Sequence, residues 1–132
     1  TYTAKGANVT TIKGTFNETL FNGKHLTPLD PYNYSAYSSY MDGGAAYQRV
    51  IVNHDQEDGS NVLFINDTSA LPFASFTALG FRETHMYWPE LAPSDSQFDR
   101  VDYVADNKID YVFFLAECDY YAIDGITKLL DR

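Results

Sequence analysis

The chain has 132 residues, 45% of them hydrophobic, which is enough for one folded domain with a core and excludes global disorder. A formal charge of −9 repels phosphate backbones and anionic lipid surfaces, so we expect no nucleic-acid partner. No apolar stretch approaches the length of a membrane span, and the one cysteine, Cys118, cannot form an internal disulfide.

The amino-terminal part, residues 1–45, predicts a β-hairpin followed by irregular chain. Residues 2–4 and 10–16 are rich in Thr, Ile and aromatic side chains, and the residues between them favour a turn. Residues 17–45 contain several Gly and Pro and predict an irregular segment, with at most one short helical turn near residues 34–40.

The remainder, residues 46–132, predicts alternating strands and helices. Strands are expected at 47–53, 61–66, 84–88 and 109–116, and helices at 70–81, 97–107 and 122–130. The runs 61–66 and 109–116 are predominantly apolar, which is typical of strands buried on both faces. This alternation predicts an α/β fold, with right-handed crossovers and a mostly parallel sheet flanked by helices. The chain is then a single domain or the carboxyl-terminal part of a larger one.

Polar residues follow three of these strands, where sites form in parallel sheets. They are Asp67, Thr68 and Ser69, then Trp88 and Glu90, then Glu117 and Asp119. A hydroxyl at a strand-to-helix turn lies beside the free N–H groups of the helix, which suits an acyl-transfer nucleophile. Asp, Thr and Ser are also the preferred helix N-caps, so the segment 67–69 can equally be purely structural.

A nucleophilic hydroxyl needs a base, and the chain offers three histidines, His25, His54 and His85. None of them lies in an Asp-x-His arrangement, and the mid-strand position of His85 favours a structural role. The acidic run at residues 55–58 lacks the spacing of an EF-hand loop and predicts a solvated turn. We therefore expect no metal and no cofactor.

Four segments, in order along the chain, carry a family resemblance. They are GTFNETL (14–20), MDGGA (41–45), NVLFINDTS (61–69) and NKIDYVFFL (107–115). They resemble the SGNH-hydrolase-like DHHW family, relatives of the alginate O-acetyltransferases, and the similarity runs over about residues 1–121. The resemblance implies that the chain is the carboxyl-terminal portion of a larger SGNH-like domain, with an SGNH- or flavodoxin-like sheet.

The resemblance also implies roles for particular residues. The hydroxyl at position 68 would accept an acetyl group, Asp67 would shape the turn, and Ser69 is the alternative nucleophile. The family's serine is Thr68 here, and the Asn of its Gly-Gly-Asn turn, a possible oxyanion donor, is Ala45. The Asp and His that name the family precede the matching region, so we expect this chain alone to be inactive or nearly so.

Two other functions stay open on the sequence. One is a non-catalytic extracellular module that binds carbohydrate or protein, with the tyrosines of residues 32–47 stacking on sugar rings. The other is a structural domain in which the same tyrosines form an interface. From the family we expect a bacterial protein, extracellular or at the cell surface, with a polysaccharide or cell-wall glycan as partner.

Overall fold

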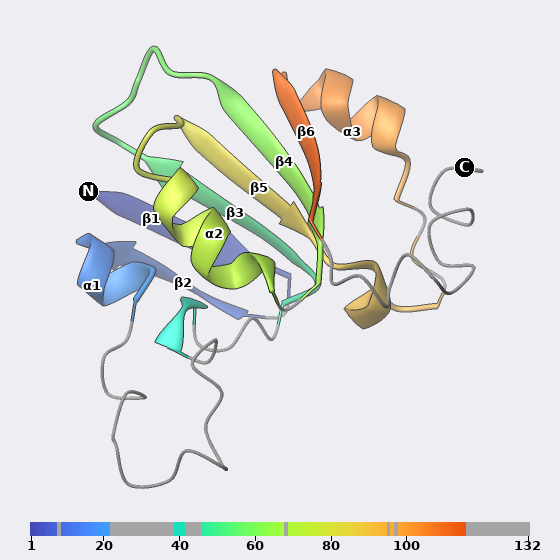
Figure 1. Ribbon diagram of the computed structural model, residues 1–132, viewed down its shortest axis with the longest axis horizontal. Helices are drawn as coiled ribbons and strands as arrows, with labels where there is room; N and C mark the ends of the chain where they lie inside the picture. Colours follow the sequence, from blue (N-terminus) through green and yellow to red (C-terminus); the bar gives the residue numbers. More distant parts are fainter. Residues whose placement is uncertain are drawn as a thin grey trace, which may run out of the picture.

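The computed structural model describes residues 1–7, 9–21, 39–41, 46–67, 69–94, 96 and 98–115. These residues form one six-stranded sheet with the strand order β2-β1-β3-β5-β4-β6 (Figure 1). The strands are β1 (Tyr2–Gly6), β2 (Val9–Gly14), β3 (Gln48–Asn53), β4 (Asn61–Asn66), β5 (Glu83–Tyr87) and β6 (Tyr111–Leu115). The helices are α1 (Phe16–Thr19), α2 (Ala70–Thr77), the 3₁₀ turn η4 (Pro89–Leu91) and α3 (Arg100–Asp106).

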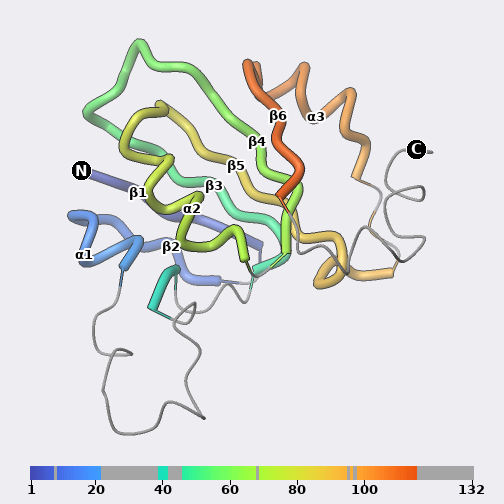
Figure 2. The backbone as a smooth tube through the Cα atoms, in the orientation of Figure 1, coloured from blue at the N-terminus to red at the C-terminus, as the bar shows by residue number. Residues whose placement is uncertain are grey.

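The sheet is mixed, so the prediction of a mostly parallel, SGNH-like sheet is wrong. β1 pairs antiparallel with both β2 and β3, and β3 pairs antiparallel with β5. Only β4 makes parallel pairs, with β5 and with β6. Strand–helix alternation, which predicts parallel neighbours, begins only at β4. The hairpin is part of the sheet rather than an addition beside it (Figure 2), and its tight turn makes β1 and β2 antiparallel.

Most of the predicted elements are present, with shifted ends. The predicted helix 70–81 ends at Thr77, and the helix predicted from residue 97 begins at Arg100, where Asp99 accepts two backbone N–H groups as its cap. The second hairpin strand stops at Gly14, because Thr15 and Glu18 begin α1 through 2.8 Å hydrogen bonds. The helix predicted at 122–130 lies outside the described residues.

The core lies on both faces of β4, whose six residues are all buried. On the α2 face, Phe64 stacks on Phe113 and meets Phe73 edge-on, each with 5.6 Å between ring centroids. On the α3 face, Leu63 and Ile65 pack with Tyr87 and with residues of and around α3. Within the described segments, no helix is long and apolar enough to cross a membrane.

One expectation about the core is wrong. The run 109–116 was predicted to form a strand buried on both faces, yet β6 lies at the edge of the sheet and is largely exposed. Its hydrophobicity is that of an interior strand, although β4 is its one neighbour among the described strands.

Candidate functional site

The turn from β4 into α2 is organised by the carboxylate of Asp67. The residue is buried, and its Oδ1 accepts the backbone N–H of Ser69 at 2.8 Å and the Ser69 hydroxyl at 2.5 Å. The Asp67 carbonyl accepts the N–H of Ala70 at 3.3 Å. Asp67 thus caps the start of α2, and the Ser69 hydroxyl is held by a carboxylate rather than pointing freely into solvent.

This capping also reduces the number of oxyanion donors at the start of α2. The N–H groups of Ser69 and Ala70 are already bonded to Asp67, and Pro72 has no N–H. These two N–H groups are therefore not available to an oxyanion at this turn. Thr68, the predicted nucleophile, lies outside the described residues, between Asp67 and Ser69 in the sequence.

Two buried polar atoms lie at the carboxyl ends of the neighbouring strands β4 and β5, and this end of the sheet is the edge meant below. Asn66 ends β4 and Trp88 follows β5, directly after the paired residues Ile65 and Tyr87. By strand alternation both lie on the α2 face, as do Phe64 and Met86 two residues earlier. Asn66 Oδ1 and Trp88 Nε1 have no hydrogen-bond partner among the described residues. A buried donor and a buried acceptor without partners are costly, so this edge has unused hydrogen-bonding capacity.

A buried arginine holds the segment around residue 41 against this part of the sheet. Arg49 lies on β3 opposite Met86, is 8% exposed, and donates from Nη1 to the Met41 carbonyl at 2.7 Å. The backbone N–H of Trp88 donates to the Tyr47 carbonyl at 2.7 Å. The chain on both sides of the predicted Gly-Gly turn therefore meets the carboxyl ends of β4 and β5.

The two described histidines are not part of this edge. His54 follows the opposite end of β3, is exposed, and lies 2.8 Å from the Thr3 hydroxyl. His85 lies in the middle of β5 and is buried, with Nδ1 2.8 Å from the Tyr103 hydroxyl and Nε2 2.9 Å from Glu83 Oε2. Nδ1 connects α3 to the sheet through Tyr103, and Nε2 is engaged by Glu83 on the same strand, so neither ring nitrogen of His85 is without a partner.

The electrostatics of His85 fit this structural role. Burial lowers the pKa of His85 below its usual value, while the hydrogen bond with Glu83 and its charge act in the opposite direction. Burial also raises the pKa of Tyr103. Because a carboxylate can only accept, His85 Nε2 donates to Glu83; the lowered pKa favours the neutral ring, in which Nδ1 accepts from the Tyr103 hydroxyl.

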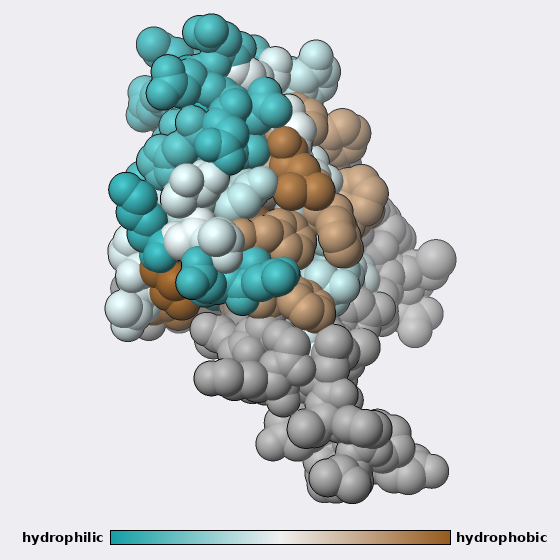
Figure 3. All heavy atoms as spheres, turned by 90° about the vertical axis from the view of Figure 1, so that its left-hand side faces the viewer, coloured by the Kyte–Doolittle hydropathy of each residue, from teal (hydrophilic) through white to brown (hydrophobic). Residues whose placement is uncertain are grey.

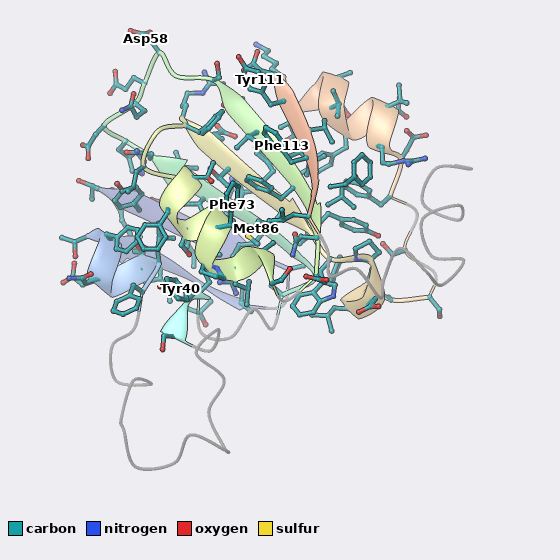
Figure 4. All side chains as sticks on the ribbon, in the orientation of Figure 1. Tyr40, Asp58, Phe73, Met86, Tyr111 and Phe113 are labelled. Carbon is teal, nitrogen blue, oxygen red and sulfur yellow. The ribbon has the colours of Figure 1, made fainter. Side chains whose placement is uncertain are left out.

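The remaining predicted residues are dispersed. Glu90 is exposed in η4, at the same edge as Trp88. Ala45, Glu117, Asp119 and His25 lie outside the described residues. The acidic turn 55–58 is exposed at the opposite end of the sheet, where Asp58 marks its tip (Figure 4). No group of His, Cys, Asp and Glu that could hold a metal occurs among the residues the structure describes.

Sequence reasoning missed Asn66 and Arg49. Asn66 was included in an apolar strand, although a polar side chain at the end of such a strand is itself a sign of a site. Arg49 lies on the buried face of β3, but Val50, Ile51 and Val52 after it are all apolar, so the sequence shows no alternation that would place Arg49 there.

Comparisons with known proteins relate the chain to larger folds. No protein-family model and no curated protein matches it. The fold is similar to that of PatB1 from Bacillus cereus, with a TM-score of 0.61, 21% identity, and 90% of this chain and 35% of that chain covered. The structure of PatB1 with a sulfonyl adduct gives a TM-score of 0.60 at 20% identity, with 88% of this chain and 36% of that chain covered. A DHHW family protein from Eubacterium siraeum gives a TM-score of 0.57 at 19% identity, with 96% of this chain and 40% of that chain covered.

These likenesses concern the fold, and the chain spans well under half the length of each of the three structures. The resemblance read from the sequence is thus supported at the coarse level: the solved structures that share this fold include a DHHW family protein and PatB1.

Proposed function

We propose that this chain forms the part of a DHHW-like domain that carries the acyl-accepting hydroxyl, and that it is inactive, or nearly so, without a base from elsewhere. Acetylated carbohydrate is the substrate class that the sequence resemblance implies. A polysaccharide or cell-wall glycan at a bacterial cell surface is the corresponding partner and location. The hydroxyl is that of Thr68, with Ser69 as the alternative.

The observation that carries the proposal is the strand–turn–helix at 61–77. β4 is the central parallel strand, and Asp67 bends the chain directly after it into α2. The carboxyl end of β4 lies at the same end of the sheet as Asn66 and Trp88, where sites form in parallel sheets. A similar fold carries a sulfonyl adduct in PatB1, and sulfonyl groups are attacked by activated nucleophiles.

In the proposed reaction the Thr68 oxygen attacks the acetyl carbonyl of an ester and loses its proton to a base. The ester oxygen then leaves as an alcohol, taking up a proton, and the acetyl group remains on Thr68 until a second hydroxyl or water accepts it. His85 is a poor candidate for the base, because both of its ring nitrogens already have partners. Asp67 is also a poor candidate, because its Oδ1 accepts two donors from Ser69.

Acetyl-ester hydrolysis with an added base tests this proposal. We expect the chain to hydrolyse p-nitrophenyl acetate close to the background rate, and imidazole to accelerate a component that Thr68→Ala abolishes. Ser69→Ala should retain that component, and Asp58→Ala, at the exposed turn, is the matched control for an unrelated polar substitution. An imidazole-dependent rate that is unchanged in Thr68→Ala would exclude the hydroxyl at position 68.

A non-catalytic binding module is the second candidate, and the half-buried aromatic side chain of Trp88 at the carboxyl end of β5 favours it. The indole face of Trp88 can pack on a sugar ring, while Asn66 Oδ1 and Trp88 Nε1 are buried and are not available to a ligand. Titration calorimetry with O-acetylated and deacetylated polysaccharides tests this candidate. Saturable binding that Trp88→Leu removes, without any Thr68-dependent hydrolysis, would favour binding over catalysis.

A further inference from the structure

The open edge of β6 has the composition of an interior strand. Its sequence, YVFFL, contains no charge, no Pro and no Gly. Four consecutive side chains are 41–51% exposed: Tyr111, Val112, Phe113 and Phe114. Edge strands of soluble proteins usually carry charges, bulges or Pro, which prevent pairing with another strand. β6 has none of these protections in its sequence.

The apolar surface continues from β6 onto α2. Tyr111 and Phe113 lie on the α2 face of the sheet, where Phe113 and the 53% exposed Phe73 both contact Phe64 (Figure 4). Viewed from the side, hydrophilic residues gather at one end and hydrophobic residues at the margin on the α2 side (Figure 3). With about 150–250 Å² per aromatic side chain, β6 and Phe73 expose roughly 400 Å² of apolar surface. Patches of this size mark interaction sites.

We propose that the β6 edge binds an apolar β-strand from polypeptide outside residues 1–132, which makes β6 an interior strand of a larger sheet. This proposal shares with the proposed function the premise that the chain is part of a larger fold, but it requires neither Thr68 nor catalysis. The partner strand supplies main-chain hydrogen bonds to the outward-facing N–H and C=O groups of β6, and apolar side chains to both faces of the edge.

Three observations favour this occupant over a second copy of the chain. The similar solved structures contain far more polypeptide than matches here, since only 35–40% of each is covered. Two copies would each carry a charge of −9 and repel one another. The exposed apolar area is also only about half of the roughly 800 Å² per partner that a stable dimer buries.

The test uses a strand peptide as the probe, with the β4 sequence NVLFIN flanked by two lysines at each end. β4 already pairs with β6 on its inner edge, so its sequence is compatible with pairing there. Amide hydrogen exchange followed by NMR reports the alternate, outward-facing amides of residues 111–115. We expect these amides to exchange freely in the chain alone and to be slowed by the peptide in a saturable manner.

Matched variants locate the binding. Val112→Lys places a charge on the edge and should weaken peptide binding by roughly tenfold or more. Val101→Lys makes the same change at a 76% exposed position of α3 and should leave binding unchanged. Peptide binding that is absent, or equal in both variants, would overturn the proposal. So would a concentration-dependent dimer of the unmodified chain, seen by light scattering, in which the β6 amides are already protected.

If Val112→Lys fails to fold, hydrogen exchange and light scattering on the unmodified chain still decide whether the peptide binds at the β6 edge.

Discussion

Replacing Asp67 tests how the turn at the candidate site is built. Asp67→Ala removes the acceptor of two hydrogen bonds from Ser69, and leaves a backbone N–H at the start of α2 without its partner. Loss of an N-cap side chain costs about 1 kcal/mol, and hydrogen bonds to a charged group are stronger, so we expect a loss of about 2 kcal/mol. Asp67→Asn keeps an acceptor oxygen and should cost about half as much.

Urea denaturation followed by circular dichroism measures these losses. With a slope of about 1–3 kcal/mol per molar for a small domain, Asp67→Ala should lower the midpoint by about 1 M without changing the slope. Asp58→Ala, at the exposed tip of the β3–β4 turn, should leave the midpoint unchanged. Equal midpoints for Asp67→Ala and Asp58→Ala would refute the role of Asp67 as the cap of α2.

Three further predictions concern the rest of the fold. Because the folded pKa of His85 is lowered from the usual 6.5, the unfolded chain takes up this proton first. The contribution of neutral His85 to stability should therefore be fully present above about pH 6.5 and be lost as the pH falls below it. Urea midpoints measured from pH 8 to 4 test this, and His85→Gln should flatten the profile. Phe64→Ala should cost about 3–5 kcal/mol, and Phe113→Ala clearly less because the ring is 47% exposed; similar losses would contradict the edge position of β6. The hydrogen bonds from the Thr15 backbone N–H and hydroxyl lower the pKa of Glu18. Thr15→Ala keeps the backbone N–H, so NMR titration should show the Glu18 pKa only partly restored in this variant; a Glu18 pKa that is not lowered in the unmodified chain would argue against the capping box.

Local structure could be predicted from the sequence because it depends on nearby residues. The predominantly apolar run 61–66 and the polar turn after it identified β4 correctly, and the helical pattern predicted for 70–81 identified α2. The pairing of strands depends on distant residues, and there the prediction was wrong. No local sequence pattern shows that β5 lies between β3 and β4, or that β1 pairs with β3. The parallel pairing that strand–helix alternation predicts for the later strands was therefore wrongly expected for β1, β2 and β3 as well.

The site shows the same division. The position of Asp67 at a strand-to-helix turn follows from the local pattern, and so does its alternative role as a cap. That Trp88 and Asn66 belong to one edge, and that Arg49 fixes the Met41 carbonyl there, follows only from strand order and register. The exposure of β6 could not be read from its sequence either, because an apolar strand has the same composition whether or not its neighbour is present.

The central claim, that position 68 carries the acyl-accepting hydroxyl, is tested most directly by covalent labelling. The chain is treated with an aryl sulfonyl fluoride in the presence of imidazole, and the labelled residue is located by tandem mass spectrometry. We predict one sulfonyl group on Thr68, absent in Thr68→Ala and retained in Ser69→Ala. Labelling that is absent from Thr68 and Ser69, or spread over exposed hydroxyls and tyrosines at similar rates, would contradict the claim.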